Sequence, residues 1–389
     1  MPPTECRPGA LDSRANSRSP VGVSRLPRAG VVAVLATLPL ALAYRFALIY
    51  RVRAGYPHRH PPVWTPKVVG LAWEDVEVPT DGGPVLPGWL IGAGTGNAPG
   101  IVLIHGWESA RDRTLAHAEV LHAVGFHVLT VDVRGHGANG PEALPMSVGE
   151  FAADARAAVA FLSGRAEVSR VALLGHSMGA AGALVAAAGD PDVAAVIAVA
   201  APAHPDRLTR QTFRLARLPI PDPIAWPLAW LTTRVYLRPR GHSVADVSAS
   251  RAIREITVPV MLVHGTDDRV VPVGDIERLA EARRAALPDA VTETLVIEGG
   301  HHSWLYEFPA YRAAIARFLA TWLGGPVDPE TAAALAEAVP AVRLPDPERL
   351  TTLDEEPGGF RSLAGMIGRR VRRPIAGSTA APEPEVTSP

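Results

Sequence analysis

Between Glu74 and Leu323, short runs of β-branched and other apolar residues alternate with longer runs of helical character. This alternation restricts the possible folds more than any other feature of the chain, because it is the pattern of a mostly parallel sheet covered by helices on both faces. The opening differs, since Asp81-Gly82-Gly83 lies between two extended runs and predicts a hairpin turn. We therefore expect an α/β domain whose sheet begins with antiparallel strands.

The expected domain covers residues 70–325. Its alternating pattern lapses between residues 202 and 256, where tryptophans lie among prolines, as in short helices packed over the edge of a sheet. We interpret residues 202–256 as a helical cap. The expected strands are residues 101–105, 126–132, 171–174, 194–200, 258–265 and 294–299.

The two ends of the chain differ from the domain in composition. Residues 1–28 are polar and interrupted by proline, and residues 326–389 are rich in proline and acidic residues, so both are predicted to be largely disordered. Within the tail, residues 360–373 place apolar residues near helical spacing beside five arginines. That segment is either a membrane-surface helix or a solvated basic stretch.

Residues 29–53 form a hydrophobic segment. The stretch 29–50 is close to the roughly 20 residues needed to cross a bilayer, if Arg45 extends to the interface. A membrane anchor is the first interpretation, with possible membrane contact through residues 29–50. Ala41-Leu42-Ala43 also resembles a signal-peptidase site, so a cleaved signal of a secreted protein and a helix of a cytoplasmic protein are alternatives.

Charge and cysteine content exclude several classes of protein. The net charge of −1 provides no field that would collect nucleic acid, so no nucleic-acid partner is expected. The single cysteine rules out an intramolecular disulfide framework, and no histidine pair has the spacing of a zinc hydrolase. We therefore expect neither a metal nor a cofactor.

The stretch Gly175-His176-Ser177-Met178-Gly179 separates an apolar run from an alanine-rich, helical run. Two glycines remove side chains that would collide if the backbone turned sharply between the strand and the helix. Such a turn would expose the serine hydroxyl and direct the next amide, that of Met178, toward an incoming oxyanion. The alternative is a glycine turn with a solvent-facing serine.

A serine nucleophile needs a base, and the base works best when a carboxylate holds its second nitrogen. Candidates for both follow later strands of the expected sheet. Asp267 and Asp268 come after the strand ending at Gly265, and His301 and His302 come after the strand ending at Gly299. Since ligands collect at the carboxyl ends of parallel strands, these residues are expected on the same edge as the serine.

Residues 74–323 resemble the α/β-hydrolase superfamily. The resemblance rests on motifs that occur in order along about 250 residues: His105-Gly106, DVRGHG at 132–137, GHSMG at 175–179, HGTDDRVVP at 264–272 and GGHHS at 299–303. It implies an α/β-hydrolase fold with a mostly parallel central sheet, helices on both faces and a helical cap insertion.

The resemblance also implies roles for individual residues. Ser177 matches the nucleophile. The register of the acid motif favours Asp268 over Asp267, and the usual distance from the last strand favours His302 over His301 as the base. His105 and His136 are interpreted as structural residues that hold loop backbones.

A second oxyanion donor is expected from the loop after the first long strand. By the resemblance this donor is the backbone N–H of Trp107, which would act together with that of Met178. The expected function is therefore that of a serine hydrolase, first of all a carboxylesterase or lipase-like enzyme acting on a small hydrophobic ester or acyl substrate. A serine peptidase or aminopeptidase-like enzyme is the second interpretation, and a non-catalytic binding protein of the same fold is the third.

Overall fold

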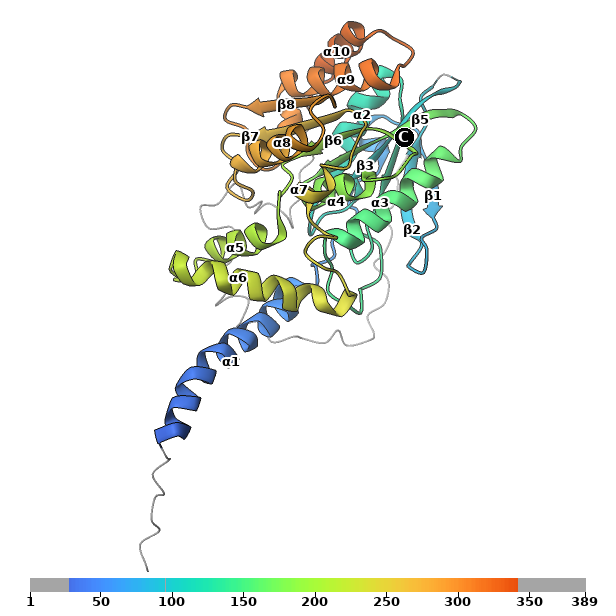
Figure 1. The fold of residues 1–389 in the computed structure, drawn as a ribbon. Helices are drawn as coiled ribbons and strands as arrows, with labels where there is room; N and C mark the ends of the chain where they lie inside the picture. Colours follow the sequence, from blue (N-terminus) through green and yellow to red (C-terminus); the bar gives the residue numbers. More distant parts are fainter. Residues whose placement is uncertain (1–27, 95, 342–389) are drawn as a thin grey trace, which may run out of the picture. The chain divides into compact units, whose positions relative to one another are not determined.

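A computed structural model describes residues 28–94 and 96–341 of the 389-residue chain, with side chains from Thr37 onward. The chain divides into two units, Met1–Leu42 and Ala43–Pro389, and the second unit contains the whole sheet and all the candidate site residues (Figure 1). The predicted disordered start lies almost entirely outside the described residues. The basic segment 360–373 lies wholly outside them.

In the described residues, eight strands form one sheet in the order β1-β2-β4-β3-β5-β6-β7-β8. Strand β2 pairs antiparallel with β1 and with β4, whereas all later pairs are parallel. The predicted antiparallel opening of the sheet is thus confirmed. The strands are β1 Glu74–Val78, β2 Leu86–Ile91, β3 Ala98–Ile104, β4 His127–Val131, β5 Val168–His176, β6 Val193–Val199, β7 Val260–Gly265 and β8 Thr292–Ile297.

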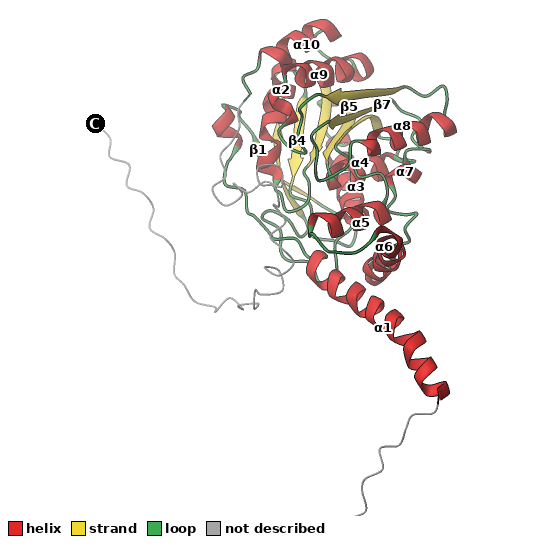
Figure 2. Cartoon of the chain, turned by 90° about the vertical axis from the view of Figure 1, so that its left-hand side faces the viewer, coloured by secondary structure: helices red, strands yellow, loops and turns green. Residues whose placement is uncertain are grey.

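Helices cover both faces of the sheet (Figure 2). Helices α3, α4, α7 and α8 contribute to the core on one face, and α2, α9 and α10 to the core on the other. The helices are α1 Arg28–Ala54, α2 Leu115–Val124, α3 Val148–Ser163, α4 Met178–Ala187, α5 Pro205–Leu215, α6 Asp222–Leu237, α7 Ala249–Ala252, α8 Gly274–Ala286, α9 Pro309–Leu323 and α10 Pro329–Ala338, with short 3₁₀ helices η1 Pro66–Val69, η2 Arg111–Thr114, η3 Arg238–Arg240 and η4 Leu305–Glu307.

The central strands are largely apolar because both of their faces are buried. In β3, Val102 and Ile104 belong to the core under α3 and α4, whereas Ile101 and Leu103 belong to the core under α2 and α9. All four side chains are fully buried. A strand that is buried on both faces gives a continuous hydrophobic run rather than an alternating one, which is the pattern of the sequence here.

Local signals fix where the helices begin and end. Helix α3 starts with a capping box, in which the Ser147 side chain accepts from the Gly149 amide and the Glu150 carboxylate accepts from the Ser147 amide. Helix α2 ends at Gly125, whose φ of 96° lies in the left-handed region that glycine adopts without steric cost. These ends set the lengths of the connections that lead into the site.

Helix α1 contains the predicted hydrophobic segment 29–53 and runs through Pro39 without a break. Among the residues that the structure describes, no helix combines the length and the apolar character needed to cross a bilayer. The membrane anchor at residues 29–50 stays a prediction.

The segment predicted as a cap, residues 202–256, divides into two parts. Helices α5 and α6 pack against each other. Helix α7 instead packs against α4 and α8, and Val247, Ala249 and Ile253 belong to the core beneath the sheet. The helical insertion is therefore the α5–α6 pair, and the chain has already returned to the body of the domain by residue 247.

The prediction of a disordered tail from residue 326 is wrong for residues 329–338, which form helix α10 against α9. The Asp328 carboxylate accepts hydrogen bonds from the amides of Glu330 and Thr331, and Pro329 occupies the first turn. Proline and acidic residues were interpreted as signs of disorder, yet at this position they are helix-start signals. Arg312 of α9 donates to the carbonyl of Ala336 near the other end of α10.

Candidate active site

Ser177 lies at the sharp turn between β5 and α4. Its φ of 54° and ψ of −118° are strained for a residue with a side chain, and such strain persists only where the surrounding structure enforces it. The two flanking glycines provide the necessary space. A Cβ on Gly175 would lie 2.3 Å from the carbonyl oxygen of Gly179, and a Cβ on Gly179 would lie 2.4 Å from that of His105.

Replacing Gly179 by alanine is expected to lower the free energy of unfolding by about 2–3 kcal/mol, because the new methyl group would overlap backbone atoms that cannot move aside. Gly140→Ala is the matched control, since a Cβ there has nothing within 4 Å and Gly140 has no positive φ. Urea unfolding monitored by circular dichroism measures both. Equal stability of the two variants would show that the turn does not depend on close backbone approach.

A continuous hydrogen-bonded chain joins three side chains from distant parts of the sequence. Nε2 of His302 lies 3.0 Å from Oγ of Ser177, and Nδ1 of His302 lies 2.8 Å from Oδ2 of Asp268. All three residues are buried to at least nine-tenths. In this arrangement the imidazole donates its Nδ1–H to the carboxylate, which leaves Nε2 free to accept the serine proton.

The carboxylate of Asp268 is held from several sides. Its Oδ1 accepts from the amides of Val270 and Val271, both at 2.8 Å, while Nε2 of His264 lies 3.1 Å from its Oδ2. Burial alone would raise the pKa of Asp268, but the charge of His302 and the hydrogen bonds from His264 and His302 outweigh burial and hold the pKa well below its usual range. Asp268 is therefore ionised at neutral pH.

The neighbours that the sequence left as alternatives do not join this chain. Asp267 and His301 are exposed, and the side-chain contact recorded for Asp267 is with the Thr266 hydroxyl at 3.4 Å. Of the two tandem pairs, the structure brings Asp268 and His302 to Ser177.

The two segments that carry the expected oxyanion donors, Met178 and Trp107, adjoin Ser177. The amide of Met178 is at the first position of α4, where helix N–H groups have no partner within the helix. Trp107 follows Gly106 in the loop after β3, and a Cβ on Gly106 would lie 3.4 Å from Cβ of Ser177. This loop therefore lies directly against the serine turn.

Two further histidines contact the hydrogen-bonded residues: His176 lies against His302, and His264 lies against Asp268. His176 donates from Nε2 to the backbone carbonyl of His302, at 2.7 Å, and the two ring centroids lie 4.9 Å apart with the ring planes tilted by 54°. Burial, assisted by the charge of His302, lowers the pKa of His176 to about 3, so its ring is neutral. His264 donates from Nε2 to the carbonyl of Val271, at 3.0 Å, beside Asp268.

From the sequence, no task was assigned to His176 or to His264. The one available signal was their position inside the motifs GHSMG and HGTDD. The interpretation of His105 and His136 as structural is confirmed. Nδ1 of His105 donates to the carbonyl of Gly106, and Nδ1 of His136 donates to that of Arg134.

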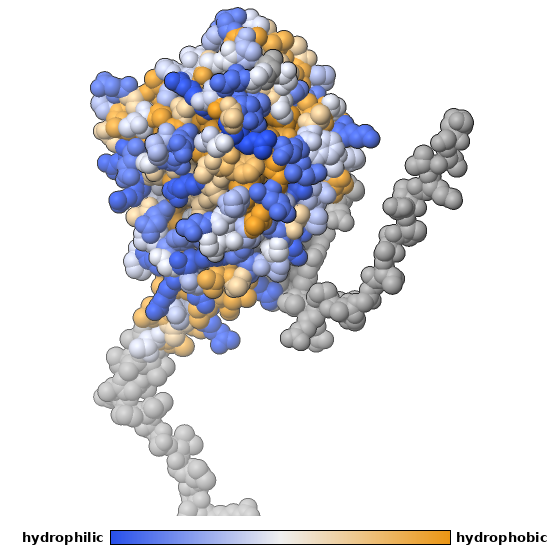
Figure 3. Space-filling model, turned by 90° about the vertical axis from the view of Figure 1, so that its right-hand side faces the viewer, coloured by the Kyte–Doolittle hydropathy of each residue, from blue (hydrophilic) through white to orange (hydrophobic). Residues whose placement is uncertain are grey.

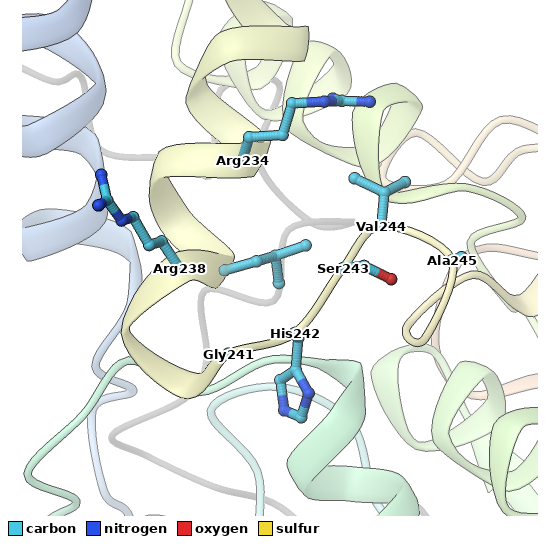
Figure 4. Close-up of a pocket in the computed structure, with 8 residues that line it drawn as sticks. Arg234, Arg238, Gly241, His242, Ser243, Val244 and Ala245 are labelled. Carbon is cyan, nitrogen blue, oxygen red and sulfur yellow. The ribbon is translucent and has the colours of Figure 1, made fainter.

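A surface pocket of about 550 Å³ lies away from these residues. Figure 4 shows that its side chains Arg234, Arg238 and His242 point in different directions rather than toward one position. Arg234 pairs with Asp206, and His242 with Glu150. The pocket is lined by Arg234, Leu237, Arg238, Gly241, His242, Ser243, Val244 and Ala245, and so by none of the candidate site residues.

Within residues 28–94 and 96–341, no group of three or more His, Cys, Asp or Glu side chains is placed to bind a metal ion.

Comparison with known proteins identifies the family to which the chain is similar. The family model described as "Alpha/beta hydrolase family" matches residues 101–318. An uncharacterised protein of Mycobacterium tuberculosis is 32% identical over 263 residues, which cover 66% of this chain and 82% of that protein.

Solved structures agree with the fold. The esterase Pf2001 of Pyrococcus furiosus is 26% identical, with a TM-score of 0.55, over 69% of this chain and 100% of that one. An acylaminoacyl peptidase of Pyrococcus horikoshii is 16% identical, with a TM-score of 0.50, over 67% of this chain and 44% of that one. At that identity the peptidase shows a shared fold and nothing more about substrate.

Proposed function

Because this chain belongs to the alpha/beta hydrolase family, we propose that it is a serine hydrolase that cleaves carboxylic esters through an acyl-enzyme. The observation that carries the proposal is the hydrogen-bonded chain from Ser177 through His302 to Asp268. A serine hydroxyl is a weak nucleophile by itself, and this chain supplies the base that it needs and the carboxylate that orients that base.

In the proposed first half-reaction, Oγ of Ser177 attacks the ester carbonyl carbon while Nε2 of His302 takes the hydroxyl proton. Negative charge then develops on the carbonyl oxygen, where the amides of Met178 and Trp107 would stabilise it. When the tetrahedral intermediate collapses, the bond to the leaving alkoxide breaks. The alkoxide takes the proton from His302 and departs as an alcohol, leaving the acyl group on Ser177.

In the second half-reaction, water replaces the alcohol. Nε2 of His302 removes a proton from the water, the resulting hydroxide attacks the acyl carbon, and the same two amides receive the second oxyanion. Collapse returns the proton to Oγ of Ser177 and releases the carboxylic acid. Throughout the cycle Asp268 stays ionised and holds the imidazole in one orientation, in keeping with its lowered pKa.

We propose a hydrophobic ester as the substrate, and the position of the α5–α6 pair and the similar chain Pf2001 are the two observations that bear on it. Gln211 of α5 donates to the carbonyl of Arg269, the residue after Asp268, so the helical insertion adjoins the acid loop. The relative Pf2001 is described as an esterase. Hydrolysis of short nitrophenyl esters, but not of aminoacyl naphthylamides, would favour the esterase over the peptidase interpretation.

Covalent labelling tests the nucleophile directly. A fluorophosphonate probe is expected to label the wild-type chain and not Ser177→Ala, because only an activated serine attacks the phosphorus. Ser303→Ala, which removes a serine near the base but outside the proposed chain, should label like the wild type. Labelling of Ser177→Ala would assign the nucleophile elsewhere, and unlabelled but folded wild type would favour a non-catalytic binding protein.

A further inference from the structure

The first three turns of α6 expose an apolar surface. Ile224 is 57% exposed, Trp226 41% and Trp230 54%, and Pro223 and Pro227 beside them are exposed as well. We call these five residues the α6 face. Isolated apolar residues are common on protein surfaces, but two tryptophans and an isoleucine within seven residues form a contiguous patch, and such patches mark interaction sites.

Arginines lie against both tryptophans of this face. The guanidinium of Arg210 lies 4.6 Å from the ring centroid of Trp226, and that of Arg234 lies 4.2 Å from the ring centroid of Trp230. Each indole thus has a cation on one side while much of its surface stays open to solvent. Tryptophan beside arginine is the combination found where proteins meet the interfacial region of a bilayer.

The charge of the surrounding helices is strongly one-sided. Residues 43–54 and 205–240 together contain ten arginines and two aspartates, although the whole chain has a net charge of −1. Arg207 and Arg240 pair with Asp275 and Glu142 in the body of the domain. The two aspartates of these ranges pair with Arg210, Arg214 and Arg234, so part of the positive charge is neutralised. The remainder leaves the α5–α6 region positive and complementary to an anionic surface.

These helices are packed together and joined to the domain. Phe46 and Tyr50 of α1 contact the ring of Phe213 in α5, with centroids 5.5 and 5.7 Å apart. The Tyr236 hydroxyl of α6 donates to the carbonyl of Met146. The α6 face is therefore presented on a fixed element rather than on a loose loop. Figure 3 shows one face of the molecule, on which hydrophobic residues are interspersed with hydrophilic ones over the body of the domain.

We propose that the α6 face docks onto an anionic lipid bilayer, with its tryptophans and isoleucine in the interfacial region and the arginines of α5 and α6 at the headgroups. The charge excess favours this partner, since ten arginines against two aspartates in residues 43–54 and 205–240 match a sheet of phosphate groups. Docking places the α5–α6 pair, and with it the acid loop that Gln211 contacts, at the membrane surface. This inference does not depend on the proposed anchor at residues 29–50.

A fluorescent probe on the face tests this docking in the full-length chain. Cys6 is the only cysteine, so Cys6→Ser/Ile224→Cys carries one environment-sensitive label. Leu335→Cys on α10, 40% exposed, is the matched control. With phosphatidylglycerol vesicles the label at 224 should brighten by roughly threefold and be quenched by nitroxide lipids, whereas the label at 335 should not change. Salt at about 0.5 M should reverse most of the effect.

Each alternative outcome has a definite meaning. No response at 224, an equal response at 224 and 335, or an equal response to neutral phosphatidylcholine overturns the docking of this face on an anionic surface. A response that lipid quenchers leave unchanged but that rises with protein concentration assigns the face to a second copy of the chain. Adding Trp226→Ala and Trp230→Ala to the 224 label should abolish the response, while circular dichroism shows that the fold is retained.

Discussion

Replacing His302 by alanine is expected to lower kcat/KM for nitrophenyl butyrate by about 10⁴-fold or more, because Ser177 then loses the group that accepts its proton. The loss should appear mainly in kcat, since the base acts in the transition state rather than in binding. His301→Ala is the matched control. His301 is exposed and lies next in the chain, so its removal should leave kcat/KM within about threefold of wild type.

The double variant Ser177→Ala/His302→Ala should be no less active than either single variant. Residues that act as one unit lose their whole contribution when any member is removed, so the two losses do not add. Fully additive losses would mean that Ser177 and His302 act in separate steps. If His301→Ala lost most of its kcat/KM while His302→Ala stayed active, His301 and not His302 would be the base.

Much of the fold could be predicted because the central strands are buried on both faces. Their continuous apolar runs, as at Ile101–Ile104, stand out from the helices that alternate with them. The order of strands in the sheet could not be predicted in the same way, since pairing depends on contacts between distant segments. The end of the cap could not be predicted either. The burial of Ile253 in the core depends on tertiary packing, which the local sequence pattern does not show.

The main residues of the candidate site were predicted, but some of their neighbours were missed. Motif spacing favoured Asp268 and His302. In the structure His302 is within hydrogen-bonding distance of both Ser177 and Asp268. The contacts of His264 and His176 were missed, because their positions inside the motifs do not reveal which backbone carbonyl each ring donates to. Helix α10 was missed for a related reason. Asp328 and Pro329 indicate disorder when they are taken as part of a polar tail, but they also favour the start of a helix.

Removing the negative charge of Asp268 is expected to lower kcat almost as much as removing the base, His302. Asp268→Asn keeps the shape of the side chain but replaces an acceptor by an amide, so the imidazole of His302 loses its negative partner and its correct tautomer. We expect kcat to fall by about 10⁴-fold. Asp267→Asn, at the exposed neighbour, should change kcat by less than about threefold.

The pH dependence of stability gives a second measure of the same carboxylate. The folded-state pKa of Asp268 lies below its unfolded value, so its ionised form stabilises the fold above about pH 4, and this contribution is lost as the pH falls toward the folded pKa. The stability gap between wild type and Asp268→Asn, measured by urea unfolding, should therefore be widest at neutral pH and narrow below about pH 4. A constant gap with unchanged kcat would place Asp268 outside the site and return the role of the acid to Asp267.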